Sequence, residues 1–437
     1  MTNPTQGYKK TTRIVHGAAK TSRWDYSHHV VPPLTASTTF RLETVKRGAR
    51  GFTEFGRFDR DESSAPVYIY DRLDEPTRGL LENQIAALEG ADACLTFASG
   101  MAAISAALGC LLQTGDEIVA HTLLYGCTHS LFENWYPKLG VKVKRVDFRD
   151  PKAVSAAVNS RTRALYFESP VNPTLDLVDI RSISEIARSA SKGRKRPVLS
   201  IIDNTFATPF GQRPIEHGAD IVVHSLTKNI GGFGTEIGGA ACCSKGIFPA
   251  LMGYRKDFGG VLSPKAAWNI LVYGVPTIPL RIKRQQYTAL QVAQFLSNHP
   301  LIAEVRYPGL DTFPQRGLAL RQMRDFDGGF APGNMIYFRL DERKVDGTRF
   351  IDHVAQNAYC VTLAVSLGHT KTLIEMPSAM THSAYAGAGP MREDRGIRLS
   401  IGLESPVDII RDLESSLKAV QKAASGHRAA RTSKTAA

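Results

Sequence analysis

A carboxylate, two hydroxyls and a lysine follow two short apolar runs in the middle of the chain. Asp203 ends the first run, and Ser225, Thr227 and Lys228 end the second, just before a glycine-rich segment at 231–235. Such runs are typical of buried strands, which deliver side chains to one edge of a sheet. This set suits a cofactor with a basic ring nitrogen, a phosphate and an aldehyde, with which lysine forms a Schiff base. The combination therefore predicts pyridoxal phosphate (PLP), held by Lys228.

Polar residues after other apolar runs suit the same site. Ser99, Gly100 and Met101 precede a helix whose first N–H groups could bind a phosphate, although Ser-Gly is also an ordinary helix start. Tyr125 could stack on a planar ring and act as an acid or base, or it could only cap the core. Asn172, in a loop with two prolines, could bond the phenolic oxygen of the ring or only close a turn.

Charged residues also allow two interpretations. Asp203 could keep the pyridine nitrogen protonated, or it could cap a helix. Arg398 interrupts an alternating apolar run and could bind a substrate carboxylate through two hydrogen bonds, or it could lie on a strand surface. Lys228 taken alone is typical of a solvated lysine, since most lysines are exposed. The combination of these residues at successive strand ends favours the cofactor site.

These side chains require a sheet that presents several strand ends along one edge. Helical stretches alternate with seven strand-like runs, at 93–97, 117–121, 142–146, 164–168, 198–203, 221–224 and 240–243. The alternation predicts an α/β fold with a largely parallel sheet and helices on both faces. Active residues are then expected at the strand ends and in the loops that follow.

The chain is expected to divide into four parts: an extended, subunit-contacting arm at 1–75, a PLP-binding α/β domain at 76–278, a smaller α+β domain at 279–425 and a disordered basic tail at 426–437. Pro276 and Pro279 are expected to break the helical pattern before a long helix at 280–299. Strands at 335–340 and 398–402 are expected in the smaller domain.

Composition excludes several classes of function. The net charge is +13, but part of the excess lies in a loop at 188–196 and in the tail, without aromatics between the basic residues, so no nucleic acid partner is expected. No apolar run approaches the ~18 residues of a membrane helix, and 1–23 has no secretory core, so no membrane partner and a cytoplasmic location are expected. The six cysteines have no metal-type spacing, so no metal is expected.

The chain resembles the Cys/Met-metabolism PLP-dependent enzymes from about Pro32 to Val420. The motifs that carry the resemblance are Tyr70-Asp-Arg72, Pro76-Thr-Arg78, Ser99-Gly-Met101, Tyr125-Gly126, Glu168-Ser-Pro-Val-Asn172-Pro, Asp203-Asn-Thr-Phe, His224-Ser225-Leu-Thr227-Lys228, Val365-Ser-Leu-Gly368, Met380-Thr-His-Ser and Arg398-Leu-Ser. The resemblance implies the PLP-dependent transferase fold (aspartate aminotransferase-like, fold type I). It also implies a homotetramer, built as a dimer of dimers, that acts on a small amino acid.

The resemblance also implies a role for each motif residue. Lys228 would bind the cofactor covalently and move protons, Asp203 would pair with the ring nitrogen, and Tyr125, acidified by nearby cations, would stack on the ring and assist the leaving group. Ser366 and Arg398 would bind the substrate carboxylate. Two residues of a neighbouring subunit, its copies of Tyr70 and Arg72, would reach the phosphate. The residues of this chain that would hold the phosphate are Ser99, Gly100, Met101, Ser225 and Thr227.

The choice of substrate depends on residues beside this cofactor site. Cys127 and Val365 are similar to the methionine γ-lyases, which eliminate a thiol from methionine to leave a 2-oxo acid and ammonia. Residues 231–235 and Lys371 are instead similar to O-acetylhomoserine sulfhydrylases. Asn229, Glu75 and Phe233 depart from the usual family pattern. The alternatives therefore stay open: γ-replacement on an O-acyl-homoserine, cystathionine γ-lyase activity, or a basic binding protein on a PLP fold without catalysis.

Overall fold

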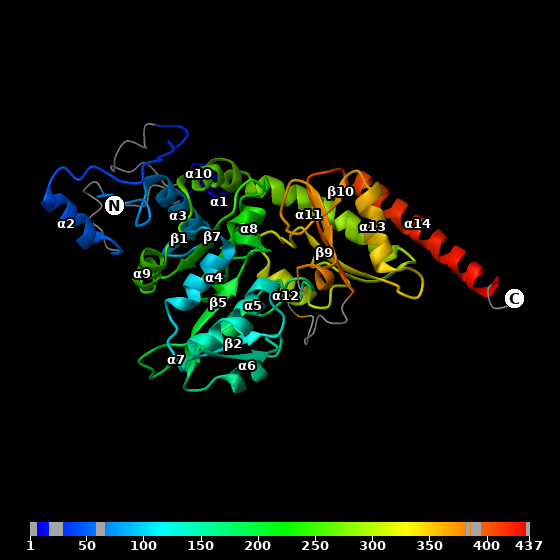
Figure 1. Cartoon of the computed structure of the whole chain (residues 1–437), viewed down its shortest axis with the longest axis horizontal. Coiled ribbons are helices and arrows are strands. Elements are labelled where there is room, and N and C mark those ends of the chain that lie inside the picture. Colours follow the sequence, from blue (N-terminus) through cyan, green and yellow to red (C-terminus); the bar gives the residue numbers. More distant parts are fainter. Residues whose placement is uncertain (1–6, 17–28, 58–65, 382–384, 386–394, 434–437) are drawn as a thin grey trace.

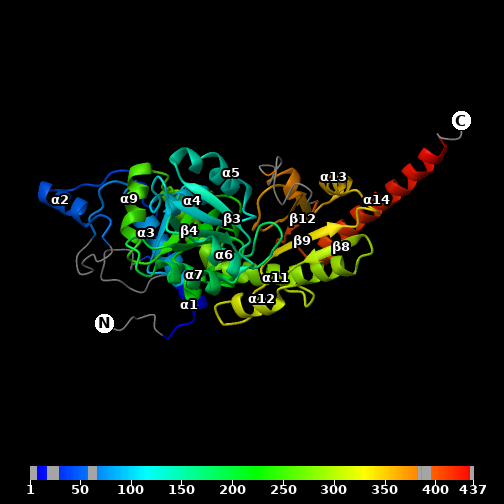
Figure 2. The same ribbon diagram turned by 90° about the horizontal axis from the view of Figure 1, so that it is seen from below.

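The chain folds into an elongated molecule with a large central domain, a smaller C-terminal domain and an N-terminal arm. The computed structural model describes residues 7–16, 29–57, 66–381, 385 and 395–433. The arm helix α2 (Val45–Glu54) stands at one end of the molecule, and the C-terminal helix α14 (Pro406–Ser433) forms the other end (Figures 1 and 2).

The large domain is built on a seven-stranded sheet with the order β1-β7-β6-β5-β4-β2-β3. Its strands are β1 (Ala93–Phe97), β2 (Glu117–His121), β3 (Lys142–Val146), β4 (Thr162–Glu168), β5 (Leu199–Asp203), β6 (Ile221–Ser225) and β7 (Gly239–Cys243). All are parallel except β7, which runs antiparallel to both of its neighbours. All seven strands expected from the sequence are confirmed, and so is the largely parallel sheet.

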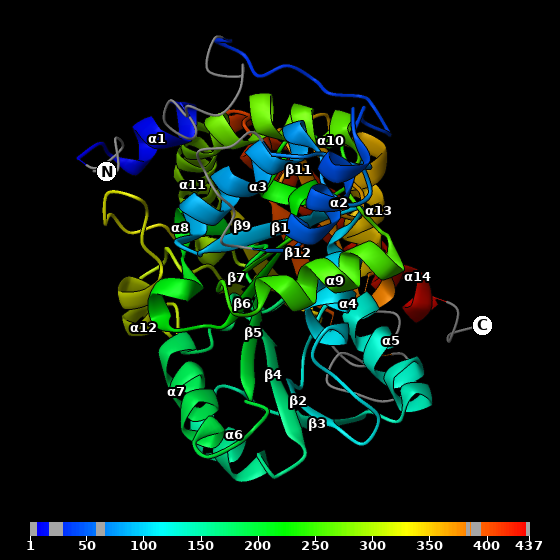
Figure 3. The same cartoon turned by 90° about the vertical axis from the view of Figure 1, so that its left-hand side faces the viewer.

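Helices cover both faces of this sheet (Figure 3). The apolar strands alternate between the faces: Leu165 and Phe167 pack into one buried cluster, and Ala164 and Tyr166 pack into another. The first face is covered by α3 (Pro76–Glu89), α6 (Pro151–Ala157), α7 (Ile180–Ser191) and α8 (Thr208–Gly211). The second face is covered by α4 (Gly100–Gly109), α5 (Gly126–Asn134) and α9 (Phe248–Phe258). Both faces are buried, so the strands carry continuous apolar runs.

The smaller domain has a five-stranded sheet with the order β10-β11-β12-β9-β8, which is antiparallel apart from the β10–β11 pair. Its strands are β8 (Ile302–Arg306), β9 (Met335–Leu340), β10 (Val361–Leu363), β11 (Thr372–Glu375) and β12 (Ile397–Ser400). Its main helices are α11 (Val275–Asn298), α13 (Gly347–Asn357) and α14, which share a core with the sheet; the short α12 (Arg316–Gln322) lies outside that core. The expected α+β domain is confirmed.

Pro276 and Pro279 do not break the chain as expected. Helix α10 (Pro264–Asn269) continues through a π-helical turn, η5 (Ile270–Gly274), directly into α11. Pro276 lies in the first turn of α11, where a missing N–H costs little. Pro279 lies inside α11, and near it the carbonyl of Gly274 accepts bonds from Thr277 Oγ1 at 3.0 Å and Arg281 Nη2 at 2.9 Å. Because α11 runs continuously, it spans the expected domain boundary.

The two ends of the chain are more helical than expected. The arm contains α1 (Lys10–His16) as well as α2, and Ile14 of α1 is 1% exposed in the core of the large domain. Part of the arm therefore packs on its own chain. The tail expected to be disordered from residue 426 instead continues α14 to Ser433, and half of residues 426–433 are the strong helix formers alanine and arginine. None of the helices in the described ranges is long and apolar enough to span a membrane.

Candidate active site

A cavity of about 600 Å³ opens at the carboxyl edge of the large sheet, where the smaller domain meets it. The residues that line it are Ser99, Gly100, Met101, Ile104, Tyr125, Gly126, Cys127, Ser130, Glu168, Pro170, Asn172, Asp203, Thr205, Phe206, Ser225, Thr227, Lys228, Val365, Ser366, Leu367, Met380, Thr381 and Arg398. The structure therefore brings together every site residue expected from the sequence except Tyr70 and Arg72. In the Met380 motif, His382 and Ser383 lie outside the described residues.

One end of the cavity has the form of a phosphate cradle. Ser99 caps α4, and its Oγ accepts a bond from the N–H of Ala102 at 3.1 Å. The first N–H groups of a helix have no acceptor within the helix and carry the positive end of its dipole. A Cβ on Gly100 would lie 3.0 Å from Cβ of Ser225, and a Cβ on Gly239 would overlap the Ser99 carbonyl. Glycine thus lets two backbones approach at this point, and the cradle fits a phosphate.

Thr205 completes this end of the site and was not singled out from the sequence. Its Oγ1 accepts a bond from the N–H of Ser225 at 2.8 Å, and its own N–H donates to Asp203 Oδ1 at 2.9 Å. Thr205 therefore joins the ends of β5 and β6. The signal was available, because a residue two positions after an aspartate at a strand end is placed for an Asx turn.

Lys228 lies in a π-helical turn, η4 (Leu226–Ile230), at the end of β6, and its own backbone is not helical, with φ −92° and ψ −136°. Irregular turns of this kind are frequent at functional sites. The Nζ atom donates to Ser366 Oγ at 2.6 Å. Burial, with a further contribution from Arg398, lowers the pKa of Lys228 to about 8. The neutral amine, which is the nucleophilic form, is therefore accessible near physiological pH.

Two carboxyl groups line the cavity, those of the buried Glu168 and the half-buried Asp203. Burial raises the pKa of Asp203, and hydrogen bonds from Thr205 and the charges of His224 and Lys228 oppose that rise. Burial and the charge of Asp203 together raise the pKa of Glu168 to about 8. Glu168 Oε1 accepts the N–H of Tyr125 at 2.6 Å and so fixes the start of α5. An Asp203 carboxylate without a full countercharge fits a cationic ring nitrogen, as PLP presents.

Arg398, on β12, is held by three acceptors. Its Nη1 donates to Asn172 Oδ1 at 2.9 Å, and its Nη2 donates to the carbonyl of Ser366 at 2.8 Å. Nη2 also forms an ion pair with Glu375 Oε1 at 2.8 Å. Arg398 and Glu375 are 3% and 1% exposed. The first bond fixes the Asn172 amide so that its Nδ2 remains available as a donor. Glu375 was not identified from the sequence, because its register opposite Arg398 depends on the β11–β12 pairing.

Tyr125 and Cys127 form the side of the cavity nearest the start of α5. Cys127 Sγ donates to Tyr125 Oη at 3.4 Å. Burial and then Cys127 raise the pKa of Tyr125, and the lowering effect of Arg398 is smaller. The expected acidification by nearby cations is therefore wrong for the single chain. A phenol with a raised pKa keeps its proton at neutral pH and gives it up less readily than a free tyrosine does.

Tyr70 and Arg72 lie outside the cavity of their own chain. Tyr70 is 41% exposed, and the Arg72 guanidinium lies 5.5 Å from the centre of its ring. Arg72 Nη1 donates to the carbonyl of Lys256, which belongs to α9. Of the residues expected to hold a phosphate, these two alone have no role in the cavity formed by the single chain.

Comparisons with known proteins agree with this architecture. Residues 11–418 match the family described as Cys/Met metabolism PLP-dependent enzyme. An L-methionine gamma-lyase of Fusobacterium nucleatum subsp. polymorphum is 40% identical over 89% of this chain and 93% of its own. An O-acetyl-L-homoserine sulfhydrylase of Leptospira meyeri is 35% identical over 94% and 97%.

Among solved structures, a cystathionine gamma-lyase from Lactobacillus plantarum complexed with L-serine superimposes with a TM-score of 0.81. It is 32% identical, and the match covers 95% of this chain and 100% of that one. The expected fold type I is confirmed by this likeness and by the two-domain architecture. The chain belongs to the Cys/Met-metabolism PLP-dependent enzymes.

Proposed function

We propose that this enzyme catalyses γ-elimination of methionine, or of a closely related sulfur amino acid, to a 2-oxo acid, ammonia and a thiol. PLP is its cofactor, as in the family as a whole. The single observation that carries the proposal is the composition of the cavity wall. Cys127 and Val365, the residues that are similar to the methionine γ-lyases, both line the cavity.

The residues present fit PLP at each of its functional groups. Lys228 would hold the cofactor covalently, and Asp203 would pair with the ring nitrogen. The amide of Asn172 would donate to the phenolic oxygen, because Arg398 occupies its Oδ1. A further set would hold the phosphate, comprising Ser99, Gly100, Met101, Ser225 and Thr227. When bound, PLP supplies an electron sink that acidifies the Cα and Cβ hydrogens of an amino acid.

The chain itself performs the binding and proton transfers. Arg398 binds the substrate carboxylate with help from Ser366. Lys228, whose pKa is lowered to about 8, accepts the Cα proton as a neutral amine, and it would also move the Cβ proton, whose loss allows the γ-substituent to leave. Ser366 is near enough to orient the Lys228 amine. Tyr125, which its raised pKa keeps protonated at neutral pH, is the cavity residue that would donate a proton to the departing sulfur so that it leaves as a thiol. Water then releases ammonia and leaves the 2-oxo acid.

The location of the competing features supports elimination over replacement. Residues 231–235 and Lys371 are the ones similar to sulfhydrylases. Gly231 and residues 233–235 line a separate depression that opens beside Thr227. Lys371 precedes β11 and is exposed, outside the main cavity. The features that favour elimination therefore line the main cavity, and those that favour replacement lie outside it.

A substrate panel tests the proposal. The PLP-loaded enzyme is incubated with methionine, with cystathionine, and with O-acetylhomoserine plus sulfide, while 2-oxobutanoate, thiol and homocysteine are measured. We expect methionine to yield equal amounts of 2-oxobutanoate and methanethiol. Homocysteine from O-acetylhomoserine without turnover of methionine would establish γ-replacement as the function. Lys228→Ala should abolish all of these reactions.

Each site is also proposed to be shared between two subunits of a cytoplasmic homotetramer. The exposed position of Tyr70 and Arg72, away from their own cavity, supports this arrangement. They would reach the phosphate bound by a neighbouring chain. Sedimentation of the holoenzyme measures the oligomeric state, and a monomeric active enzyme would exclude shared sites.

A further inference from the structure

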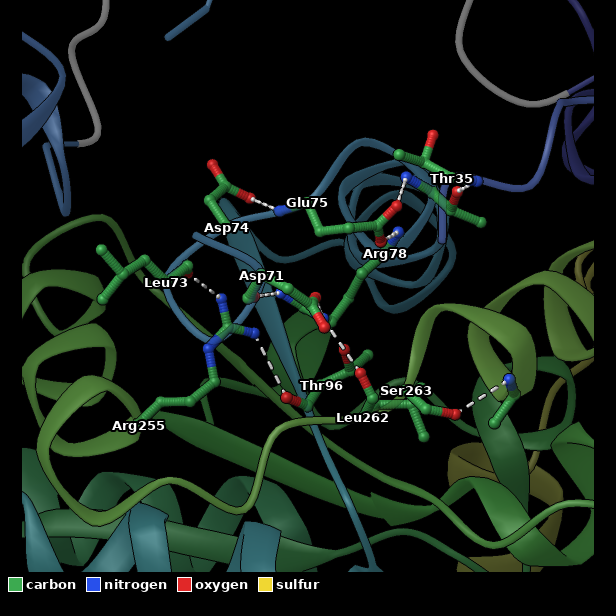
Figure 4. Close-up of polar contacts among 12 residues, drawn as sticks. Thr35, Asp71, Leu73, Asp74, Glu75, Arg78, Thr96, Arg255, Leu262 and Ser263 are labelled. Atoms are coloured by element: carbon green, nitrogen blue, oxygen red, sulfur yellow. Dashed lines mark hydrogen bonds and ion pairs between the residues drawn. The ribbon is translucent and has the colours of Figure 1, made fainter. Parts of the chain in front are cut away.

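The turn that carries Tyr70 and Arg72 is held by two arginines, one from the helix that follows it and one from a distant helix (Figure 4). Arg78 belongs to α3 and Arg255 to α9, and both are 0% exposed. A buried guanidinium group loses its hydration, so it requires several well-placed acceptors. Those acceptors show what the two arginines hold in place.

Arg78 holds the residue between Tyr70 and Arg72. Its Nη1 donates to Asp71 Oδ1 at 2.8 Å and to the carbonyl of Leu262 at 3.0 Å, and its Nη2 donates to the carbonyl of Asp71. Both the backbone and the side chain of Asp71 are therefore fixed. On the other side, the N–H of Asp71 donates to the Thr38 carbonyl at 2.9 Å.

Arg255 connects the same turn to the central sheet. Its Nη2 donates to the carbonyl of Leu73 at 3.2 Å, and its Nη1 donates to the carbonyl of Thr96 at 3.2 Å and pairs with Glu82 Oε1 at 2.5 Å. The same Glu82 oxygen accepts the N–H and the hydroxyl of Thr96, each at 2.8 Å. Thr96 lies on β1, three residues before Ser99, so the turn and the phosphate cradle are attached to one strand.

The start of α3 is fixed as well. Glu75 is 0% exposed, and its two carboxylate oxygens accept the N–H groups of Thr77 and Arg78, each at 2.7 Å. Burial raises the pKa of Glu75, and these bonds oppose that shift. Thr77 Oγ1 also accepts the N–H of Thr35, from the arm, at 2.9 Å. Glu75, which departs from the family pattern, thus caps the helix that carries Arg78.

We propose that Arg78 and Arg255 are positioning residues for the neighbouring subunit's active site. They hold Tyr70 and Arg72 in a rigid turn that is attached to β1 through Arg255. Strand β1 leads into this chain's own phosphate cradle. The inference rests on the proposed sharing of sites between subunits. Because buried, multiply bonded arginines define geometry more than they add stability, the turn is preorganised before the neighbour's cofactor binds.

Asp71→Asn tests the inference with a mild change. Asparagine keeps the volume and one acceptor oxygen but removes the charge that faces Arg78. We expect the affinity of the apoprotein for PLP, titrated by visible absorbance, to fall about tenfold through the loss of one charge-assisted bond. Arg255→Lys, which keeps a charge but cannot reach both carbonyls, should have the same effect.

Asp116→Asn is the matched control. Asp116 is 5% exposed and pairs with Arg196 at 2.7 Å, at the opposite edge of the sheet from the cradle. Both aspartate variants should lower the melting temperature of the apoprotein, but only Asp71→Asn should weaken PLP binding. An unchanged PLP affinity in Asp71→Asn, or an equal loss in both variants, overturns the inference.

Mixed oligomers separate this inference from the proposed function. Subunits with Asp71→Asn are combined with Lys228→Ala subunits, which keep an intact turn. The site that contains Lys228 then receives its neighbour's wild-type Tyr70 and Arg72, and it should recover wild-type PLP affinity. A parallel mixture uses Arg72→Ala in place of Asp71→Asn. Recovery only in the Arg72→Ala mixture leaves shared sites intact but overturns the positioning role, whereas recovery in neither mixture refutes shared sites.

Discussion

Glu375→Gln tests how the substrate carboxylate is bound. Glu375 and Arg398 are 1% and 3% exposed and lie 2.8 Å apart, so each neutralises a buried charge of the other. Removing one partner of a buried ion pair costs about 3–5 kcal/mol. Glutamine keeps an oxygen, Oε1, that can accept from Arg398 and from Thr381 Oγ1, which donates to Glu375 Oε1 at 2.8 Å. We therefore expect the free energy of unfolding to fall by about 3 kcal/mol, the lower end of that range.

Two measurements follow from this reasoning. The melting temperature of the PLP-loaded enzyme should fall by roughly 3 °C for a loss of that size in a chain of this length. L-norleucine, which has a methylene in place of the methionine sulfur and no thiol to lose, should bind Glu375→Gln about tenfold more tightly, since its carboxylate becomes the main countercharge of Arg398. Norleucine should therefore raise the melting temperature more in the variant than in the wild type.

Glu404→Gln is the control for this experiment. The Glu404 carboxylate also bonds a strand of the smaller sheet, but it accepts from neutral groups, the N–H of Thr372 at 2.6 Å and its hydroxyl at 2.8 Å. Its replacement should leave norleucine affinity unchanged and lower the melting temperature less. If Glu375→Gln weakened norleucine binding, or if the two variants behaved alike, the role assigned to the Glu375 charge would be refuted.

Three further outcomes are expected. The rate at which the apoprotein binds PLP covalently should rise with pH and level off above a midpoint near 8, because burial lowers the pKa of Lys228 and only the neutral amine reacts. Stopped-flow absorbance measures this rate, and a rise that continues beyond pH 10 would contradict the prediction. Gly239→Ala should weaken PLP binding about tenfold in a cofactor titration, because its Cβ would displace the Ser99 carbonyl from the cradle. Asn229→Leu should lower the free energy of unfolding, measured with denaturant, by about 2 kcal/mol. The Asn334 amide donates to Asn229 Oδ1 at 3.0 Å and would lose this buried acceptor. An unchanged free energy of unfolding would show that the site relaxes around the leucine.

Much of the fold and of the cofactor site was predictable from local pattern. The strands of the large sheet are short apolar runs separated by helical periodicity, and this pattern depends only on neighbouring residues. Lys228, Asp203 and Ser99 were expected at strand ends, and parallel strands bring such ends to one edge. That rule sufficed to gather them around one cavity.

The sequence by itself therefore determined the strands of the large sheet, the family and most of the residues that line the cavity. Only the tertiary structure decided which distant groups control them. Glu375 faces Arg398 through the register of β11 against β12, and Arg78 and Arg255 meet the turn at Asp71 from two separate helices. Register, burial and the resulting pKa shifts arise from segments far apart in the chain, so no local pattern encodes them.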